Sequence, residues 1–463
     1  MPEADARPHV LYVAWGFPPC RGGGVYRALA TANGFAARGF KVTVLTATRD
    51  TFIRFTGADV SLEQQIDRGV NVVRIPFDWP AMETDVRKWT PLRALAPRLW
   101  RKVHNRRDLI PFPEHGYGPW RKPLEQAALA IHALDPVDVV VATANPNVDF
   151  MAARALHEAH QVPYVMDYRD AWMLDVFDGG LLHPDGGRVD ALERSLLADA
   201  AEVWFVNEPI RAWHQQRHPA LADRMYVVSN GYDPEFAPEP RVEPAPSDRP
   251  LTFGYIGTAS PKVPLEPFAE GWRLARADGG DLAGAQAQLW GYLGFYAIPS
   301  PVLLELVDRY AADGLSYCGP VPKTEVKMRY GTFDVALLIL GTGRYVTSGK
   351  VFEYTASALP IVSVHDPMNA ASDVLRDYPL WFPVRDLSPE AIAEALAAAG
   401  HAARHADRAT REAAREFARQ YARDLQLVPR IDALAALVGG HGLGSAGSNE
   451  SILEAIDVQE QQL

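Results

Sequence analysis

Short, strongly apolar segments recur along the chain, and longer segments between them repeat apolar residues every three or four positions. The short segments indicate β-strands that are buried on both faces, and the longer ones indicate amphipathic helices. The apolar segments are HVLYVAW, KVTVLTA, VDVVVATA, PYVMDYR and AEVWFVN in the first half, and LTFGYIG, AQAQLWGYLG, GLSYCG and FDVALLIL in the second. Because strands and helices alternate, we expect an α/β fold with two doubly wound parallel sheets.

A segment rich in proline and charge, APEPRVEPAPSDRP, separates the two halves of the chain. Such a composition is typical of an interdomain linker. We therefore predict an N-terminal Rossmann-like domain over residues 1–235, a linker over 236–250 and a C-terminal Rossmann-like domain over 251–415. The last residues, 439–463, are rich in glycine and serine and then acidic, which predicts a disordered tail.

Composition narrows the class of protein. The chain has 463 residues, a net charge of −11 and 48% hydrophobic residues, as in a soluble globular protein, and its acidic balance argues against nucleic acid as a partner. No apolar run reaches the ~20 residues of a membrane span, and we expect no signal peptide. Cys20 and Cys318 are the only cysteines, and no cluster has metal-ligand spacing. These features predict a cytoplasmic protein without disulfides or a metal site.

Three consecutive glycines, Gly22, Gly23 and Gly24, lie between the first predicted strand and its helix. Glycine lets a ligand approach the backbone closely, so this loop is a candidate binding site, and a tight turn is the alternative. The dinucleotide fingerprint G-x-G-x-x-G is not met, because Arg27 occupies its third glycine position. No acidic residue ends the second strand, so we do not expect NAD to bind here.

The segment from Thr347 to Ser363, TSGKVFEYTASALPIVS, predicts one helix followed by a buried strand. Thr347 or Ser348 can cap the helix, whose first turn then offers free N–H groups, a positive dipole end and Lys350 to an anion such as phosphate. Glu353 lies one turn further on the same side and can accept two hydroxyls of a ribose. A phosphate beside a diol describes a nucleotide; an ordinary amphipathic helix is the alternative.

This segment resembles the donor-site motif of glycosyltransferase family 4, whose members have the GT-B fold and transfer sugars with retention of configuration. DYRDAW, PEHGYGPWRKPLEQA and NGYD resemble further segments of that family. The resemblance implies two Rossmann-like domains that face each other across a cleft, with a helix over residues 416–438 that crosses back to the first domain. It implies a metal-independent hexosyltransferase with a nucleotide-diphosphate sugar as donor and no other cofactor. The acceptor would be a glycan, a lipid-linked molecule or a small molecule.

The resemblance also implies candidate site residues. Lys350 and Lys262 would be cations at the diphosphate, and Asp170 would lie near the acceptor. Asn145 stands where many members carry a histidine, and we group these four residues as the candidate catalytic positions. The candidate donor-binding residues are Gly22, Gly23, Gly24, Gly257, Thr258, Val321, Arg344, Ser348, Gly349, Val351 and Glu353.

The chain departs from the family pattern at three positions. Tyr345 replaces the first of two usual glutamates, Thr258 replaces a usual arginine, and Asn145 replaces the usual histidine. These departures keep two alternatives open, a sugar-nucleotide epimerase of the GT-B fold and a catalytically degenerate nucleotide-sugar-binding protein. Turnover of a nucleotide sugar without an acceptor would indicate the epimerase, and no turnover with any acceptor would indicate the binding protein.

Residues 87–107, RKWTPLRALAPRLWRKVHNRR, contain eight lysines and arginines and no acidic residue, and leucines and tryptophans recur among them. A basic amphipathic segment of this kind suits the anionic inner face of a membrane. The alternative is a solvated helix whose apolar side packs on the first domain. We favour that alternative because Pro91 and Pro97 are expected to break the helix.

Overall fold

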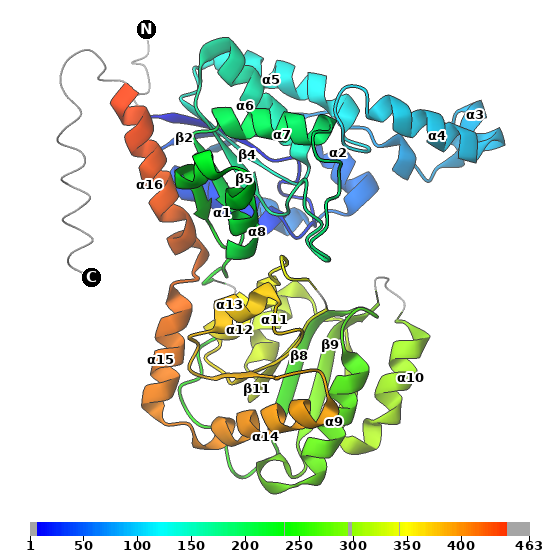
Figure 1. The fold of residues 1–463 in the computed structure, drawn as a ribbon, viewed down its shortest axis with the longest axis vertical. Helices are drawn as coiled ribbons and strands as arrows, with labels where there is room; N and C mark the ends of the chain where they lie inside the picture. Colours follow the sequence, from blue (N-terminus) through cyan, green and yellow to red (C-terminus); the bar gives the residue numbers. More distant parts are fainter. Residues whose placement is uncertain (1–6, 236, 295–298, 342, 442–463) are drawn as a thin grey trace.

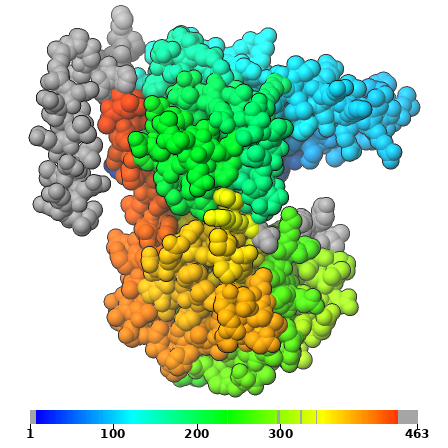
Figure 2. Space-filling model, viewed as in Figure 1, coloured from blue at the N-terminus to red at the C-terminus, as the bar shows by residue number. Residues whose placement is uncertain are grey.

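The computed structural model describes residues 7–441 except 236, 295–298 and 342. Its two lobes meet at a narrow waist (Figures 1 and 2). Each lobe is a parallel sheet with helices on both sides, so the predicted α/β fold with two doubly wound units is confirmed. No helix of the described part of the chain is long and apolar enough to cross a membrane. The predicted tail beyond residue 441 lies outside the described residues.

The first domain has a seven-stranded sheet in the order β3-β2-β1-β4-β5-β6-β7. Its strands are β1 His9–Val13, β2 Lys41–Ala47, β3 Val70–Ile75, β4 Val139–Thr143, β5 Tyr164–Tyr168, β6 Glu202–Phe205 and β7 Met225–Val227. Its helices are α1 Val25–Ala37, α2 Arg49–Thr51, α3 Pro91–Leu95, α4 Pro97–Asp108, α5 Arg121–Leu134, α6 Phe150–His160, α7 Arg188–Asp199 and α8 Glu208–Arg217. Strands β1, β4 and β5 are buried along their whole length, as their continuous apolar sequences predict.

The second domain has a six-stranded sheet in the order β10-β9-β8-β11-β12-β13. Its strands are β8 Thr252–Ala259, β9 Gln286–Leu293, β10 Leu315–Gly319, β11 Val335–Ile339, β12 Ile361–Val364 and β13 Trp381–Pro383. The helices that follow β8 along the chain are α9 Leu265–Ala277, α10 Pro301–Arg309, α11 Lys323–Tyr330, α12 Gly349–Ala356, α13 Ala370–Leu375, α14 Pro389–His405, α15 Arg408–Arg419 and α16 Arg423–His441. In both sheets the carboxyl ends of the strands point toward the waist, which is where ligands bind in open parallel sheets.

The chain crosses between the domains twice, at two segments that lie side by side. Tyr232 donates its N–H to Tyr421, and Arg423 donates its N–H to Tyr232, so the two crossings pair like short parallel strands. Helix α15 packs on α12 in the second domain, and α16 packs on α1 in the first. The return crossing therefore lies between α15 and α16, a few residues after the position near 415 that the sequence suggested.

A buried ion pair fixes the start of α1 against the sheet. The guanidinium of Arg27 lies 2.6 Å from the carboxylate of Asp167 at the end of β5, and it also donates to the carbonyl oxygen of Val228. Both charged side chains are almost fully buried. Arg169, two residues later, does not pair with Asp167 and donates instead to the carbonyl oxygens of Ala144 and Asn145.

Candidate active site between the two domains

Helix α12 begins at the interdomain waist, as the sequence predicts. Ser348 caps it by accepting from the N–H of Lys350, at 3.4 Å. The side chains that the helix turns toward the core, Val351 among them, are buried. The remaining side of the helix carries Gly349 and Glu353, which line a hollow between the domains. The start of α12, with the positive end of the helix dipole, therefore lies at the hollow that the first domain also lines.

We name this space the interdomain hollow; its volume is about 410 Å³. It is lined by Gly23, Gly24, Tyr26, Arg27, Arg169, Asp170, Val206, Asn230 and Gly231 from the first domain, and by Tyr345, Val346, Thr347, Gly349, Glu353 and Arg423 from the C-terminal half. The glycine loop and the start of α12, which are more than 300 residues apart in sequence, thus form opposite walls of one cavity.

Arg169 is the cation that sequence reasoning missed. Among the described residues its guanidinium bonds only to the carbonyl oxygens of Ala144 and Asn145 and to no carboxylate, so its positive charge is not neutralised by an ion pair. It also explains Gly24, because a Cβ there would lie 1.0 Å from Nη1 of Arg169. The glycine leaves the space that the guanidinium fills beside the interdomain hollow.

Lys350 lies in a notch on the second-domain side of α12. Its ammonium donates to the hydroxyl of Tyr255 at 2.9 Å and lies 4.4 Å from the centre of that ring. A Cβ on Gly257 would lie 2.1 Å from Nζ of Lys350, so this glycine makes room for the lysine. Burial lowers the pKa of Lys350 to about 8, although the nearby Glu353 carboxylate acts in the opposite direction. Lys350 does not itself line the interdomain hollow; it lies beside the helix start that does.

Glu353 is oriented by the second domain. The hydroxyl of Tyr330 donates to its carboxylate at 2.6 Å, while the side chain lines the interdomain hollow. A carboxylate can accept several hydrogen bonds, including bonds from hydroxyl groups of a ligand. Its position one turn after Gly349 is the one predicted for a ribose contact.

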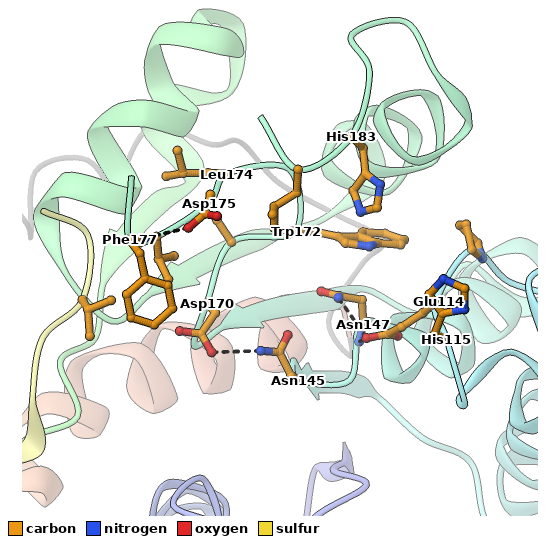
Figure 3. Close-up of a pocket in the computed structure, with 15 residues that line it drawn as sticks. Glu114, His115, Asn145, Asn147, Asp170, Trp172, Leu174, Asp175, Phe177 and His183 are labelled. Carbon is orange, nitrogen blue, oxygen red and sulfur yellow. Dashed lines mark hydrogen bonds between the residues drawn. The ribbon is translucent and has the colours of Figure 1, made fainter. Parts of the chain in front are cut away.

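A second space, the first-domain hollow, opens beside the first and has a volume of about 540 Å³. Polar groups of Glu114, His115, Asn145, Asn147, Asp170, Asp175 and His183 line it together with Trp172, Leu174, Phe177, Leu182 and Val346, among others (Figure 3). Asp170 and Val346 line both hollows, so the two spaces adjoin at these residues.

Asn145 and Asp170 point toward each other in this hollow (Figure 3), and Nδ2 of Asn145 donates to the carboxylate at 2.9 Å. Desolvation by the surrounding protein raises the pKa of the Asp170 carboxyl group above its ordinary value, although solvent still reaches this side chain. Glu114 accepts from the backbone N–H groups of Asn147 and Val148, and burial nevertheless raises its pKa to about 7. Asp170 and Asn145, predicted from DYRDAW and ATANP, therefore form one unit.

Other predicted site residues are placed apart from these hollows. Lys262 lies 5.0 Å from the ring centre of Phe177 and lines a small apolar space with Ser348. Arg344 lines a separate hollow near α8 and α13, so the structure does not bring it to Lys350. Thr258 is exposed at the end of β8, and Val321 follows β10; neither lines the hollows described above.

Two further predicted residues have mixed outcomes. Val351 is fully buried, so its side chain belongs to the core and only its backbone is near the helix start. Gly22 lies beside Cys20 at the beginning of the loop, while Gly23 and Gly24 reach the interdomain hollow.

The described residues contain one group that could hold a metal ion, Asp281 with His401 and His405. Asp281 accepts from both histidines at 3.0 and 3.3 Å, and both rings are exposed on α14. The group belongs to the second domain and does not line either hollow. The sequence does not show this cluster, because Asp281 is 120 residues before His401, and the prediction of no metal site stays a prediction.

Comparisons with known proteins agree with this architecture. Residues 22–231 match the family model described as a glycosyl transferase 4-like domain. A glycosyltransferase from Rickettsia africae has a similar structure, with a TM-score of 0.61, 12% identity, and coverage of 94% of this chain and 99% of that one. No curated protein sequence matches the chain.

Two more solved structures are similar over nearly their whole length. HepE from Anabaena, solved in complex with UDP, has a TM-score of 0.59 and 14% identity, with 93% of this chain and 100% of that chain covered. An epimerase described as a putative UDP-N-acetylglucosamine 2-epimerase from Listeria monocytogenes has a TM-score of 0.52 and 10% identity, with 95% and 98% covered. Residues 22–231 thus match a glycosyl transferase 4-like domain, and the chain as a whole has the GT-B fold of these solved structures.

Proposed function

We propose that this protein is a retaining glycosyltransferase that moves a sugar from a nucleotide-diphosphate sugar to an acceptor hydroxyl. One observation carries the proposal. The first turn of α12 and Glu353 face Gly23, Gly24 and Arg169 across a hollow that both domains line. The N-terminus of α12, the guanidinium of Arg169 and the backbone of the glycine loop are suited to bind a diphosphate. The carboxylate of Glu353 is suited to bind the ribose hydroxyls.

In this proposal the leaving diphosphate lies at the first turn of α12. Cleavage of the sugar–phosphate bond adds negative charge on the oxygen that bridged the sugar and the diphosphate, and Lys350, Arg169 and the N-terminus of α12 stabilise this added charge. Glu353 accepts hydrogen bonds from the ribose hydroxyls and positions the donor. These cations are part of the chain, so we also propose that the reaction needs no divalent metal.

The acceptor would occupy the first-domain hollow, because that space adjoins the interdomain hollow at Asp170. Its hydroxyl oxygen forms the new bond to the anomeric carbon on the face from which the diphosphate leaves. Its proton passes to the departing phosphate oxygen, so that no covalent sugar–enzyme intermediate is needed. Asp170, held by Asn145, accepts a hydrogen bond from this hydroxyl and orients it. Phe177, which is largely exposed, offers aromatic surface to the rest of the acceptor.

A melting-temperature screen of the full chain with nucleotide sugars tests donor binding. UDP-glucose is the first probe, because HepE structures were solved with UDP and UDP-glucose, and GDP-, dTDP- and ADP-sugars complete the set. A ligand at 100 times its dissociation constant adds about 2.7 kcal/mol to the free energy of unfolding, which is readily measured. No stabilisation by any member of the set would contradict the proposed donor site.

Product analysis then separates the alternatives. Transfer predicts nucleoside diphosphate release that depends on an added acceptor, with the new glycosidic bond in the donor's configuration. An altered sugar nucleotide without acceptor would indicate an epimerase, like the Listeria protein of the same fold. Donor binding with no product from a broad acceptor set would indicate a nucleotide-sugar-binding protein. A cytoplasmic location stays a prediction, and the free thiols of Cys20 and Cys318 fit a reducing compartment.

A further inference from the structure

Helices α3 and α4, with the turn at 86–88, form an arm that projects from the side of the first domain (Figure 1). The favoured sequence interpretation, in which the apolar side of this segment packs on the domain, was wrong. Leu95 is 87% exposed, Leu99 53% and Val103 41%. Leu99 and Val103 are four residues apart on α4 and share one face of that helix, and Leu95 is exposed at the end of α3 just before it; we call these three residues the stripe.

Cations flank this stripe. Arg98, Arg101, Lys102, Arg106 and Arg107 are all exposed. Among the described residues none of these five forms an ion pair with a carboxylate. Arginine and lysine side chains elsewhere on the first domain commonly have such a partner, as Arg54 has in Glu83 and Arg74 has in Glu63. The arm therefore combines exposed aliphatic side chains with uncompensated positive charge.

Contacts on the inner side of the arm hold its shape, and the exposed leucines take no part in them. Arg93 lies between the rings of Trp89 and Trp100, at 4.3 and 4.6 Å from their centres, and donates to the carbonyl oxygen of Glu83. Trp100 stacks on His104 at 4.6 Å. These contacts fold the arm on itself, so the exposed leucines are not needed to hold its shape.

We infer that the α3–α4 arm docks on the surface of an anionic lipid bilayer. A helix with aliphatic residues on one face and lysines and arginines beside them lies in the membrane interface, where the aliphatic side chains enter the acyl boundary and the cations meet acidic headgroups. A polyanion such as nucleic acid would use the charges but would leave Leu95 and Leu99 in water. The bilayer uses both features of the surface.

The arm leads directly into the first-domain hollow. Arg188 of α7 donates to the carbonyl oxygens of Leu109 and Ile110, which fastens the end of α4 to the domain. Five residues after Asp108 the chain reaches Pro113, which with Glu114 lines that hollow; five residues span at most about 18 Å. We therefore place the acceptor, whose existence rests on the proposed function, at the membrane as a lipid-linked molecule whose polar end enters the hollow.

Vesicle flotation of the full chain tests the docking surface apart from any activity. Vesicles of phosphatidylcholine with 30% phosphatidylglycerol are compared with pure phosphatidylcholine at low salt. The four-fold variant Arg101→Gln, Lys102→Gln, Arg106→Gln and Arg107→Gln removes charge only. At about 1 kcal/mol for each basic residue near an acidic surface, its partition coefficient is expected to fall roughly 500- to 1,000-fold. The double variant Leu95→Asn and Leu99→Asn keeps the charges and removes the apolar contact.

A matched control removes the same number of positive charges from the second domain, by Arg→Gln at the exposed positions 385, 408, 415 and 419. It should float like the wild type, and all variants should keep the wild-type melting temperature and its increase with the nucleotide-sugar probe. Both arm variants should lose binding to the acidic vesicles.

Three results would overturn the proposal: no flotation of the wild type on the acidic vesicles, an equal loss in the control variant, or full binding by the leucine variant. Because the melting-temperature increase with donor is measured on the same samples, its absence would instead count against the proposed function. A docking failure and a failure of the glycosyltransferase assignment are therefore distinguishable.

Discussion

Lys350→Met should stabilise the protein without ligand while it impairs donor turnover. Burial lowers the pKa of Lys350 from its usual 10.5 to about 8. Because one pKa unit corresponds to about 1.36 kcal/mol, burying the charged ammonium costs about 3 kcal/mol of folding free energy. Methionine fills similar space without a charge, but it loses the hydrogen bond to Tyr255, which contributes about 1 kcal/mol. We therefore expect the free energy of unfolding to rise by roughly 2 kcal/mol at pH 7.

The pH dependence follows from the direction of this pKa shift. Below pH 8 the lysine is protonated in both the folded and the unfolded chain, so the wild type carries the full cost of burial. Between about pH 8 and 10.5 the folded lysine is neutral while the unfolded one still binds a proton, and the stability of the wild type rises with pH. The advantage of the methionine variant is thus largest below pH 8 and shrinks above it.

Urea unfolding at several pH values between 7 and 9.5 measures this difference, with Lys262→Met as the control. Lys262 is exposed and contacts only the ring of Phe177 among the interactions described above, so the same substitution there should lower the stability by at most about 1 kcal/mol and should not raise it. In kinetics the variant at 350 should lose mainly kcat, because the leaving diphosphate gains charge in the transition state. In the wild type kcat/KM for the donor should fall as pH rises through about 8, and the variant should lack that step. A variant at 350 that is less stable than the wild type at pH 7, with unchanged kcat, would refute the reasoning.

Three other outcomes are expected. Glu353→Gln should raise KM for the donor roughly 10- to 100-fold with little change in kcat, since a charge-assisted hydrogen bond contributes about 1.5–3 kcal/mol; an unchanged KM would remove Glu353 from the ribose site. Asp170→Asn should lower kcat with acceptor by roughly 100-fold or more but leave the melting-temperature increase with donor intact; loss of donor binding would place it at the donor instead. Treatment with EDTA should leave initial rates unchanged, and activity that disappears and returns with magnesium would contradict the proposed metal independence.

Much of the fold could be predicted because its signals are local. Fully apolar strands such as β1 and β4 are recognisable without knowing their neighbours, and their alternation with helices fixes the parallel arrangement. The arm shows where this reasoning ends. Leucines at intervals of four look the same whether a domain covers them or water does, and only the tertiary structure shows that Leu95 and Leu99 face outward. Pro97 does break the segment, as expected: α3 ends at Leu95, and Pro97 begins α4, where its missing N–H costs nothing.

The candidate site divides in the same way. Ser348, Gly349 and Glu353 could be predicted because a single helix sets their spacing. Arg169 and Glu114 could not, since their roles depend on Ala144 and Asn147, which come from other segments of the chain. Arg344 was a candidate donor-binding residue in the loop before α12, yet it lines a separate hollow near α8 and α13. Residues of a site that lie on one helix can be predicted from their spacing in the sequence. Residues that different segments bring together can be identified only from the three-dimensional structure.

The paired crossings at Tyr232 and Arg423 determine how the lobes can move. The two crossing segments are hydrogen-bonded to each other, so they resist twisting and sliding of one lobe relative to the other. The motion that remains is a hinge rotation about an axis through these segments. Arg423 donates to Asn230 and pairs with Asp233 at this axis, and it also lines the interdomain hollow. In a hinge rotation of this kind, the separation of the two lobes increases with distance from the two chain crossings. The contact of Phe177 with Lys262 joins the two lobes away from these crossings, so a rotation that widens the interdomain hollow there would have to break this contact.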